Sequence, residues 1–240
     1  MSNAVYTIQA KVGYSQVRSD NFLTLYSALN YMQDCAMTQL EYLGGGEEYF
    51  KNHGVALFIS SMQVDIYEMP IFNQDILIDT WAYSYDKISC YRNYLIRDKD
   101  DKIYCSGSVA GIFVSLNDNK PVAITNEFMS VYPLKEKFNM EYLPRKIKLP
   151  TDWDNEGRPL VINKRHLDKN NHVNNSRYIS LAEEMILDDY DIKKLRIEYK
   201  KPAKVGDTII PKIKYTEKGC ITALTNIDTS VFATVEFYFN

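Results

Sequence analysis

The sequence predicts an α+β chain of two tandem units, each a long helix wrapped by a curved antiparallel sheet. The same order of elements, a short extended run, a helix and a group of strands, occurs in residues 1–135 and again in residues 158–240. Residues 117–157 are richer in Pro, Asn and charged residues, as a connecting segment would be, and we take residues 136–157 as the linker between the units. Because a second copy can extend the sheet of the first, we expect the two sheets to join into one continuous sheet.

The first unit opens with an extended run over residues 5–17. Apolar residues then recur at spacings of three and four, which indicates a helix; these residues are Leu29, Met32, Ala36, Leu40 and Leu43. Three glycines, 44–46, end that helix. Alternating apolar residues next predict strands, with a charged turn at 98–102; the strands are expected at 56–67, 75–85, 88–97 and 103–116.

The second unit repeats this order over a shorter length. A short strand at 159–163 precedes a helix at about 175–187. Four further strands are predicted, at 193–201, 208–215, 220–227 and 231–239. The pattern Tyr67-x-x-Pro70-x-x-x-x-Asp75 also reappears as Tyr199-x-x-Pro202-x-x-x-x-Asp207, which supports an internal duplication.

Composition excludes several classes of protein. No stretch approaches the roughly 20 apolar residues of a membrane span, and no basic and apolar leader opens the chain, so we expect a cytoplasmic protein without a membrane span. A net charge of −3 argues against nucleic-acid binding. The cysteines are widely spread, which predicts buried thiols rather than disulfides or a zinc cluster; they are Cys35, Cys90, Cys105 and Cys220.

Charge is unevenly distributed along the chain. Residues 145–214 hold 16 Lys and Arg against 11 Asp and Glu, although the whole chain is acidic. This basic region is suited to an acidic protein partner. The alternative is an ordinary solvated surface.

The chemistry is expected just before the second helix, where Asp168, Asn170 and His172 alternate. If this segment is extended, alternation places the three side chains on one side of the chain. A carboxylate, an amide and an imidazole would then meet. His172 or Asp168 can accept a proton from water, and Asn170 can bind an oxygen atom.

The helix that follows adds a second element to this site. Asn174 or Asn175 suits its N-cap, and the free N–H groups of the first turn can stabilise an oxyanion. Neither a metal nor a cofactor is required.

Two other interpretations of the segment stay open. Asn, Asp and His before a helix are often turn and capping residues. A zinc site formed by His166, Asp168 and His172 is disfavoured, because structural zinc sites usually have four ligands and cysteine is absent here.

The motif Asp168-x-Asn170-x-His172-Val173-Asn174-Asn175-x-x-Tyr178 resembles one in plant and bacterial acyl-ACP thioesterases. Thr80-Trp81, Arg92 and the segment Ile197-Glu198-Tyr199-Lys200-Lys201 also fit that family. The resemblance covers nearly the whole chain.

This resemblance implies two tandem hotdog domains and hydrolysis of fatty acyl groups from acyl carrier protein. It implies a catalytic motif in the second domain, with Asn174, Asn175, Tyr178 and Trp81 contacting substrate. The first domain would hold the acyl chain, since its own segment before the helix, residues 20–25, lacks the Asp/Asn/His set.

The chain departs from the plant members at one point. Where they carry a glutamate and a cysteine, this chain has Pro202 and Ala203. Either Asp168 with His172 suffices, or Glu184 of the helix substitutes, unless Glu184 only bonds within the helix.

The carrier and the class of protein also have alternatives. A hotdog hydrolase acting on acyl-CoA would use the same chemistry, and a non-catalytic acyl-binding module would explain the missing glutamate. Exposed strand edges make a homodimer a reasonable expectation.

Overall fold

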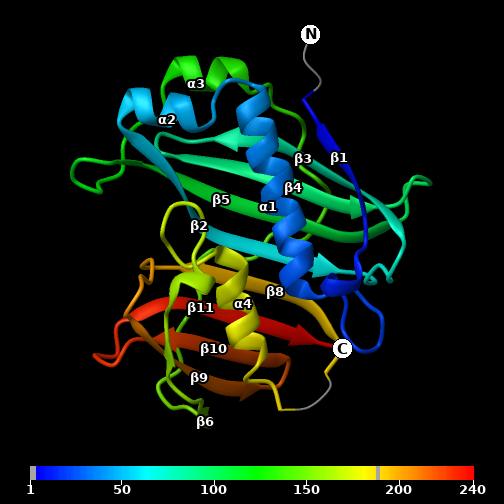
Figure 1. Cartoon of the computed structure of the whole chain (residues 1–240), viewed down its shortest axis with the longest axis vertical. Helices are drawn as coiled ribbons and strands as arrows, with labels where there is room; N and C mark the ends of the chain where they lie inside the picture. The colour runs from blue at the N-terminus through cyan, green and yellow to red at the C-terminus, as the bar shows by residue number, and fades with distance from the viewer. Residues whose placement is uncertain (1–3, 188–189) are drawn as a thin grey trace. The chain divides into compact units, whose positions relative to one another are not determined.

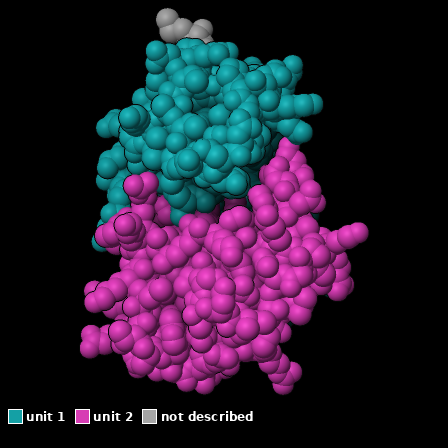
Figure 2. Space-filling model, turned by 90° about the vertical axis from the view of Figure 1, so that its left-hand side faces the viewer, with its two compact units in different colours: residues 1–60, 66–142 teal, residues 61–65, 143–240 magenta. Residues whose placement is uncertain are grey.

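The computed structural model describes residues 4–187 and 190–240 (Figure 1). The chain divides into two compact units, coloured separately in Figure 2. Unit 1 comprises residues 1–60 and 66–142, and unit 2 comprises residues 61–65 and 143–240.

Unit 1 is a helix packed on an antiparallel sheet. Its helices are α1 (Leu25–Tyr42), α2 (Glu47–His53) and α3 (Asn126–Val131), with a 3-10 turn at Tyr14–Gln16. Its strands follow the order β1-β3-β4-β5-β2; their bounds are β1 Tyr6–Lys11, β2 Val55–Ile66, β3 Asp75–Tyr85, β4 Ser89–Arg97 and β5 Ile103–Ser115. Every predicted strand of this unit is therefore present, although the extended run at 5–17 divides into β1 and the 3-10 turn.

Helix α1 lies against the sheet of unit 1 (Figure 1). Thr24 caps its N-terminus by accepting a hydrogen bond from Ser27 N at 3.1 Å. Gly44 ends it as predicted, because its φ of 74° lies in the left-handed region that glycine enters without strain. Cys35 faces β3 and donates to the carbonyl of Ile78 at 3.2 Å.

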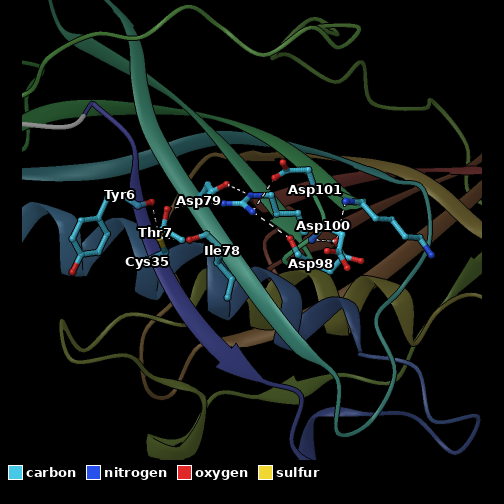
Figure 3. Close-up of polar contacts among 10 residues, drawn as sticks. Tyr6, Thr7, Cys35, Ile78, Asp79, Asp98, Asp100 and Asp101 are labelled. Atoms are coloured by element: carbon cyan, nitrogen blue, oxygen red, sulfur yellow. Dashed lines mark hydrogen bonds and ion pairs between the residues drawn. The ribbon is translucent and has the colours of Figure 1, made fainter.

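The edge of this sheet is held by a polar cluster on the face opposite α1 (Figure 3). Asp79 of β3 accepts hydrogen bonds from Thr7 Oγ1 and Arg97 Nε, each at 2.6 Å. Arg97 also pairs with Asp101 at 3.0 Å. Asp101 belongs to the predicted turn at 98–102, which is confirmed, since Asp98 N donates to Lys102 O at 3.0 Å.

Two short helices of unit 1 are not predicted from the sequence. Helices α2 and α3 occupy segments for which the sequence analysis predicts no helix. They pack on one aromatic core cluster through Tyr49 and Phe128, whose rings lie 5.4 Å apart. Tertiary packing, not a long amphipathic pattern, stabilises helices of this length.

Unit 2 repeats the arrangement with a shorter helix. Ser61–Asp65 of β2 pair with β8, and the order continues β8-β11-β10-β9-β6, with β7 also paired to β9. Its elements are β6 Asn155–Glu156, β7 Leu160–Val161, a 3-10 turn Lys164–His166, α4 Asn175–Glu183, β8 Ile192–Tyr199, β9 Thr208–Thr216, β10 Gly219–Thr225 and β11 Val231–Phe239. Helix α4 ends at Glu183, four residues before the predicted end. No helix within residues 4–187 and 190–240 is long and apolar enough to cross a membrane.

The internal duplication extends to individual backbone hydrogen bonds. Residues 13–24 and 163–174 have the same succession of 3-10 turn, tight loop and helix start. The bond from Arg18 N to Phe22 O (2.8 Å) matches that from Asp168 N to His172 O (2.8 Å). The bridge Val17–Leu23 likewise matches Leu167–Val173.

The sequence pattern of the Tyr-Pro-Asp repeat, in contrast, aligns the two units with a shift of one residue from the structural equivalence. Tyr67 N and Lys200 N make the equivalent bonds, to the carbonyls of Tyr104 and Phe232. The side chains of Gln74 and Asp207 are also equivalent, since they accept from Ile71 N (3.0 Å) and Lys204 N (2.8 Å). The duplication holds, but Tyr67 corresponds to Lys200 and not to Tyr199.

Candidate active site

The segment that carries Asp168, Asn170 and His172 is a tight turn and not an extended strand. Asp168 N donates to His172 O at 2.8 Å, and Asn171 N donates to Asp168 O at 3.1 Å. Asn171 adopts φ 59°, a left-handed conformation that asparagine tolerates. The expectation of an extended segment is therefore wrong, and the three residues lie instead on or beside a tight turn.

The carboxylate of Asp168 stabilises this turn. Its Oδ1 accepts from Asn170 N at 2.8 Å and from His172 N at 3.3 Å. Asp168 and His172 are half-buried, whereas Asn170 is exposed. Asp168 is therefore a turn residue, and the second of these bonds ties its carboxylate to the backbone of His172.

Asn174 occupies the N-cap of α4. Its Oδ1 accepts from Ser176 N at 2.9 Å and from Ser176 Oγ at 2.6 Å. The first turn of α4, with the positive end of the helix dipole, consequently begins three residues after His172.

Removing this cap has a measurable cost. Asn174→Ala is expected to lower the free energy of unfolding by about 1 kcal/mol, because Ser176 N loses its acceptor. Asn174→Asp, which keeps an acceptor oxygen, is the matched control and should stay within about 0.5 kcal/mol of the parent. Urea denaturation followed by circular dichroism measures both; equal losses for the two variants would contradict the capping role.

Tyr178 lies buried beneath the turn. Its hydroxyl accepts from Ala203 N at 2.8 Å, and burial raises the pKa of this phenol to about 12. Its ring packs edge-on against Tyr199, with ring centroids 5.8 Å apart. Tyr199 in turn donates to the carbonyl of Asn175 at 3.1 Å. Tyr178 is therefore a neutral packing residue that joins α4 to the loop at 200–206.

That loop is the place where the sequence lacks the expected glutamate. Val173 N donates to Ala203 O at 3.2 Å, so Pro202 and Ala203 run directly beside the turn. A glutamate at this point would lie beside the turn that carries His172. The loop therefore lies next to the candidate site, but Pro202 and Ala203 provide no ionisable side chain there.

The structure does not bring Glu184 to the turn. Glu184 is exposed at the C-terminal end of α4. Nine helical residues separate it from the N-cap, about 14 Å along the helix axis. The helix therefore does not supply a substitute carboxylate beside Asp168.

His166 serves the backbone and not a metal. Its Nδ1 accepts from Asn163 N at 3.1 Å, in the same way that Gln16 Oε1 accepts from Gly13 N at 2.7 Å. Burial, with help from nearby Arg177, holds the pKa of His166 below its usual value and keeps the ring neutral. Among the residues that the structure describes, no group of three or more His, Cys, Asp or Glu side chains is arranged to hold a metal ion.

Trp81 lies in unit 1 and is buried. Its indole N–H donates to the carbonyl of Glu136 at 3.0 Å, and Lys135 Nζ lies 4.8 Å from the ring centroid. Its neighbour Thr80 contacts Arg92 on the side of α1, so Trp81 projects from the other face of β3. These contacts give Trp81 a role in holding the 135–136 segment.

The duplicated turn in unit 1 has a different chemistry. Arg18, Asp20 and Phe22 stand where unit 2 has Asp168, Asn170 and His172. Unit 1 therefore lacks the imidazole, in agreement with the expectation that the chemistry belongs to the second unit.

The comparisons with known proteins agree with this organisation. Residues 3–132 match the family model for the N-terminal domain of acyl-ACP thioesterases, and residues 154–236 match the model for their C-terminal domain. Two chloroplastic oleoyl-acyl carrier protein thioesterases of Arabidopsis thaliana are each 21% identical, over 78% and 81% of this chain. The chain spans only 56% and 59% of the length of these two relatives.

Solved structures show the same fold. A structure described as an acyl-ACP thioesterase from Bacteroides thetaiotaomicron superposes with a TM-score of 0.91 at 21% identity and covers all of both chains. The 12:0-ACP thioesterase from Umbellularia californica superposes with a TM-score of 0.89 at 14% identity, covering 100% of this chain and 98% of its own. The expected fold of two tandem hotdog units is confirmed. Since the two family models together match most of its length, the chain belongs to the acyl-ACP thioesterase family.

Proposed function

We propose that this chain hydrolyses fatty acyl-ACP to free fatty acid and acyl carrier protein, by attack of an activated water on the thioester. One observation carries the proposal. The family-type motif forms a tight turn in which the Asp168 carboxylate is tied to the His172 backbone, directly before the N-terminus of α4. We propose that this short stretch of chain supplies a base, an orienting carboxylate and the groups that stabilise an oxyanion.

In the proposed reaction, His172 accepts a proton from water while the water oxygen attacks the thioester carbonyl carbon. The carbonyl oxygen becomes an oxyanion, for which the positive end of the α4 dipole and the side-chain amide of Asn170 are the proposed stabilising groups. Collapse of this intermediate breaks the carbon–sulfur bond, and His172 returns the proton to the leaving thiolate. Asp168 orients the imidazole and stabilises its protonated form.

The substrate contacts that we propose are fewer than the resemblance implies. Asn175 belongs to the first turn of α4, where it can contact the substrate, whereas Asn174 and Tyr178 act by holding that turn in place. Unit 1 is proposed to hold the acyl chain.

Exposed cations beside the motif support an acidic carrier. Lys164, Arg165, Lys169 and Lys204 lie exposed on the two loops beside the motif. The equivalent positions of unit 1 are neutral; they are Tyr14, Ser15, Ser19 and Ile71. This charge difference between duplicated loops favours an acidic carrier over a neutral one.

The test is hydrolysis of acyl-ACP and acyl-CoA of equal chain length, followed by thiol release and fatty acid analysis. We expect acyl-ACP to be the better substrate and its kcat/KM to fall with added salt, because attraction between exposed charges is screened. A higher kcat/KM for acyl-CoA would identify the coenzyme A ester as substrate. No thiol release from either would leave an acyl-binding module.

A further inference from the structure

Unit 1 contains a buried arginine without a counter-ion. Arg92 of β4 is only 6% exposed and faces α1. Its Nη2 donates to two neutral oxygens, Gln39 Oε1 and, at 3.3 Å, Thr80 Oγ1. No carboxylate in the described part of the chain forms an ion pair with Arg92.

The guanidinium also has a buried nitrogen that is not hydrogen-bonded. Arg92 Nε is shielded from solvent and has no acceptor among the described residues, and the same is true of the hydroxyl of Tyr85. The two residues are neighbours on adjacent strands, because Tyr85 of β3 pairs with Cys90 of β4 and Arg92 follows two residues later on the same face. One region of unit 1 therefore presents two unused hydrogen-bond donors.

Leaving such donors unpaired is costly. An arginine keeps its proton in proteins, so burial without an anion costs several kcal/mol, and unpaired buried donors add to that cost. A carboxylate is the group that matches a guanidinium best, since its oxygens accept charge-assisted hydrogen bonds.

The surroundings specify what the carboxylate would be attached to. Cys90, Tyr132 and Phe113 belong to an apolar cluster against which Tyr85 packs. Tyr132 differs from Tyr85 in one respect, because its hydroxyl already donates to the carbonyl of Leu40 at 3.3 Å. An aliphatic chain suits this environment, and a free inorganic anion does not.

We propose that unit 1 binds a carboxylate carried on an aliphatic chain, with Arg92 Nε and the Tyr85 hydroxyl donating to its oxygens. Such a group has two sources. A free fatty acid would be one, and an acyl substrate whose far end is a carboxylate would be the other. Only the second source rests on the proposed hydrolysis.

The first experiment measures binding of decanoate and of decanol by titration calorimetry. We expect decanoate to bind the parent protein more tightly than decanol, and Arg92→Met to weaken decanoate binding by about tenfold or more. Tyr85→Phe removes a hydroxyl that has no partner, so the variant should keep the melting temperature of the parent. Its affinity for decanoate should be about fivefold lower than that of the parent. Tyr132→Phe is the matched control and should leave decanoate affinity within about twofold.

The second experiment compares hydrolysis of two pantetheine thioesters of equal length, one ending in a carboxylate and one in a methyl group. If the acyl substrate is the source of the carboxylate, Arg92→Met and Tyr85→Phe should lower the ratio of two hydrolysis rates by about fivefold or more. This ratio is the rate for the carboxylate-ended thioester divided by the rate for the methyl-ended one. Equal decanoate affinity in the parent, Arg92→Met and Tyr85→Phe, together with an unchanged ratio of rates, would overturn the proposal. Failure of the parent to hydrolyse any thioester would refute the proposed function alone, because decanoate binding does not depend on it.

Discussion

Replacing His172 by alanine is expected to lower kcat for acyl-ACP by at least about tenfold, and removal of a general base ordinarily costs about 100-fold or more. The turn should survive this change, because its bonds use the backbone N and O of residue 172 and the carboxylate of Asp168. The loss should therefore appear in kcat, with the melting temperature nearly unchanged. Steady-state kinetics with acyl-ACP, beside a thermal melt, measures both.

A second histidine in the same segment provides the control. His166 accepts a bond from Asn163 N, and unit 1 uses Gln16 for the same purpose. His166→Gln should consequently preserve both the fold and kcat within about twofold. If His172→Ala kept the parent rate, or if His166→Gln lost as much as His172→Ala, the assignment of the base to His172 would be wrong.

The sequence predicts the regular elements well where one face of the element is buried. The strands at 75–85 and 231–239 are found with the predicted bounds, because alternation of apolar residues is a direct consequence of one buried face. Helix α1 follows from its three- and four-residue spacing. Helices α2 and α3 were missed because seven and six residues are too few for such a spacing to develop.

The site shows a different limit. The residues of the motif can be named from the sequence, but their arrangement depends on Asn171 entering the left-handed region and on Asp168 bonding the backbone. Neither is visible as a periodic pattern. The shift in the alignment of the repeat has a related reason. The left-handed residues Asn73 and Gly206 occupy equivalent positions and set the loop geometry. The Tyr and Pro residues that match in sequence are displaced by one residue from this structural equivalence.

The unpaired donors of Arg92 and Tyr85 in unit 1 could not be predicted from the sequence. Arg92 is noticeable in the sequence only as a family-like residue, and Tyr85 ends an ordinary strand. Their significance lies in missing partners, and a missing hydrogen bond is a property of the folded structure.

Asp168→Asn separates the two contributions of the carboxylate at position 168. The amide oxygen of asparagine can accept from Asn170 N and His172 N as the carboxylate does, so the turn and the free energy of unfolding should be kept within about 0.5 kcal/mol. The negative charge is lost, and with it the stabilisation of protonated His172, so kcat for acyl-ACP should fall by about tenfold or more. Asp168→Ala should lose the turn bonds as well, at an additional cost of about 1 kcal/mol in unfolding free energy.

Asp20 of unit 1 supplies the comparison for Asp168→Asn. Asp20 occupies the position of Asn170 in the duplicated turn, where unit 1 has Arg18 in place of Asp168, and it accepts a bond from Phe22 N at 3.2 Å. Asp20→Asn therefore removes a carboxylate from a turn without an imidazole. Its kcat should equal that of the parent. If Asp168→Asn also kept the parent kcat while Asp168→Ala lost stability, the carboxylate would have only its capping role, and His172 would have to act without a charged partner at position 168.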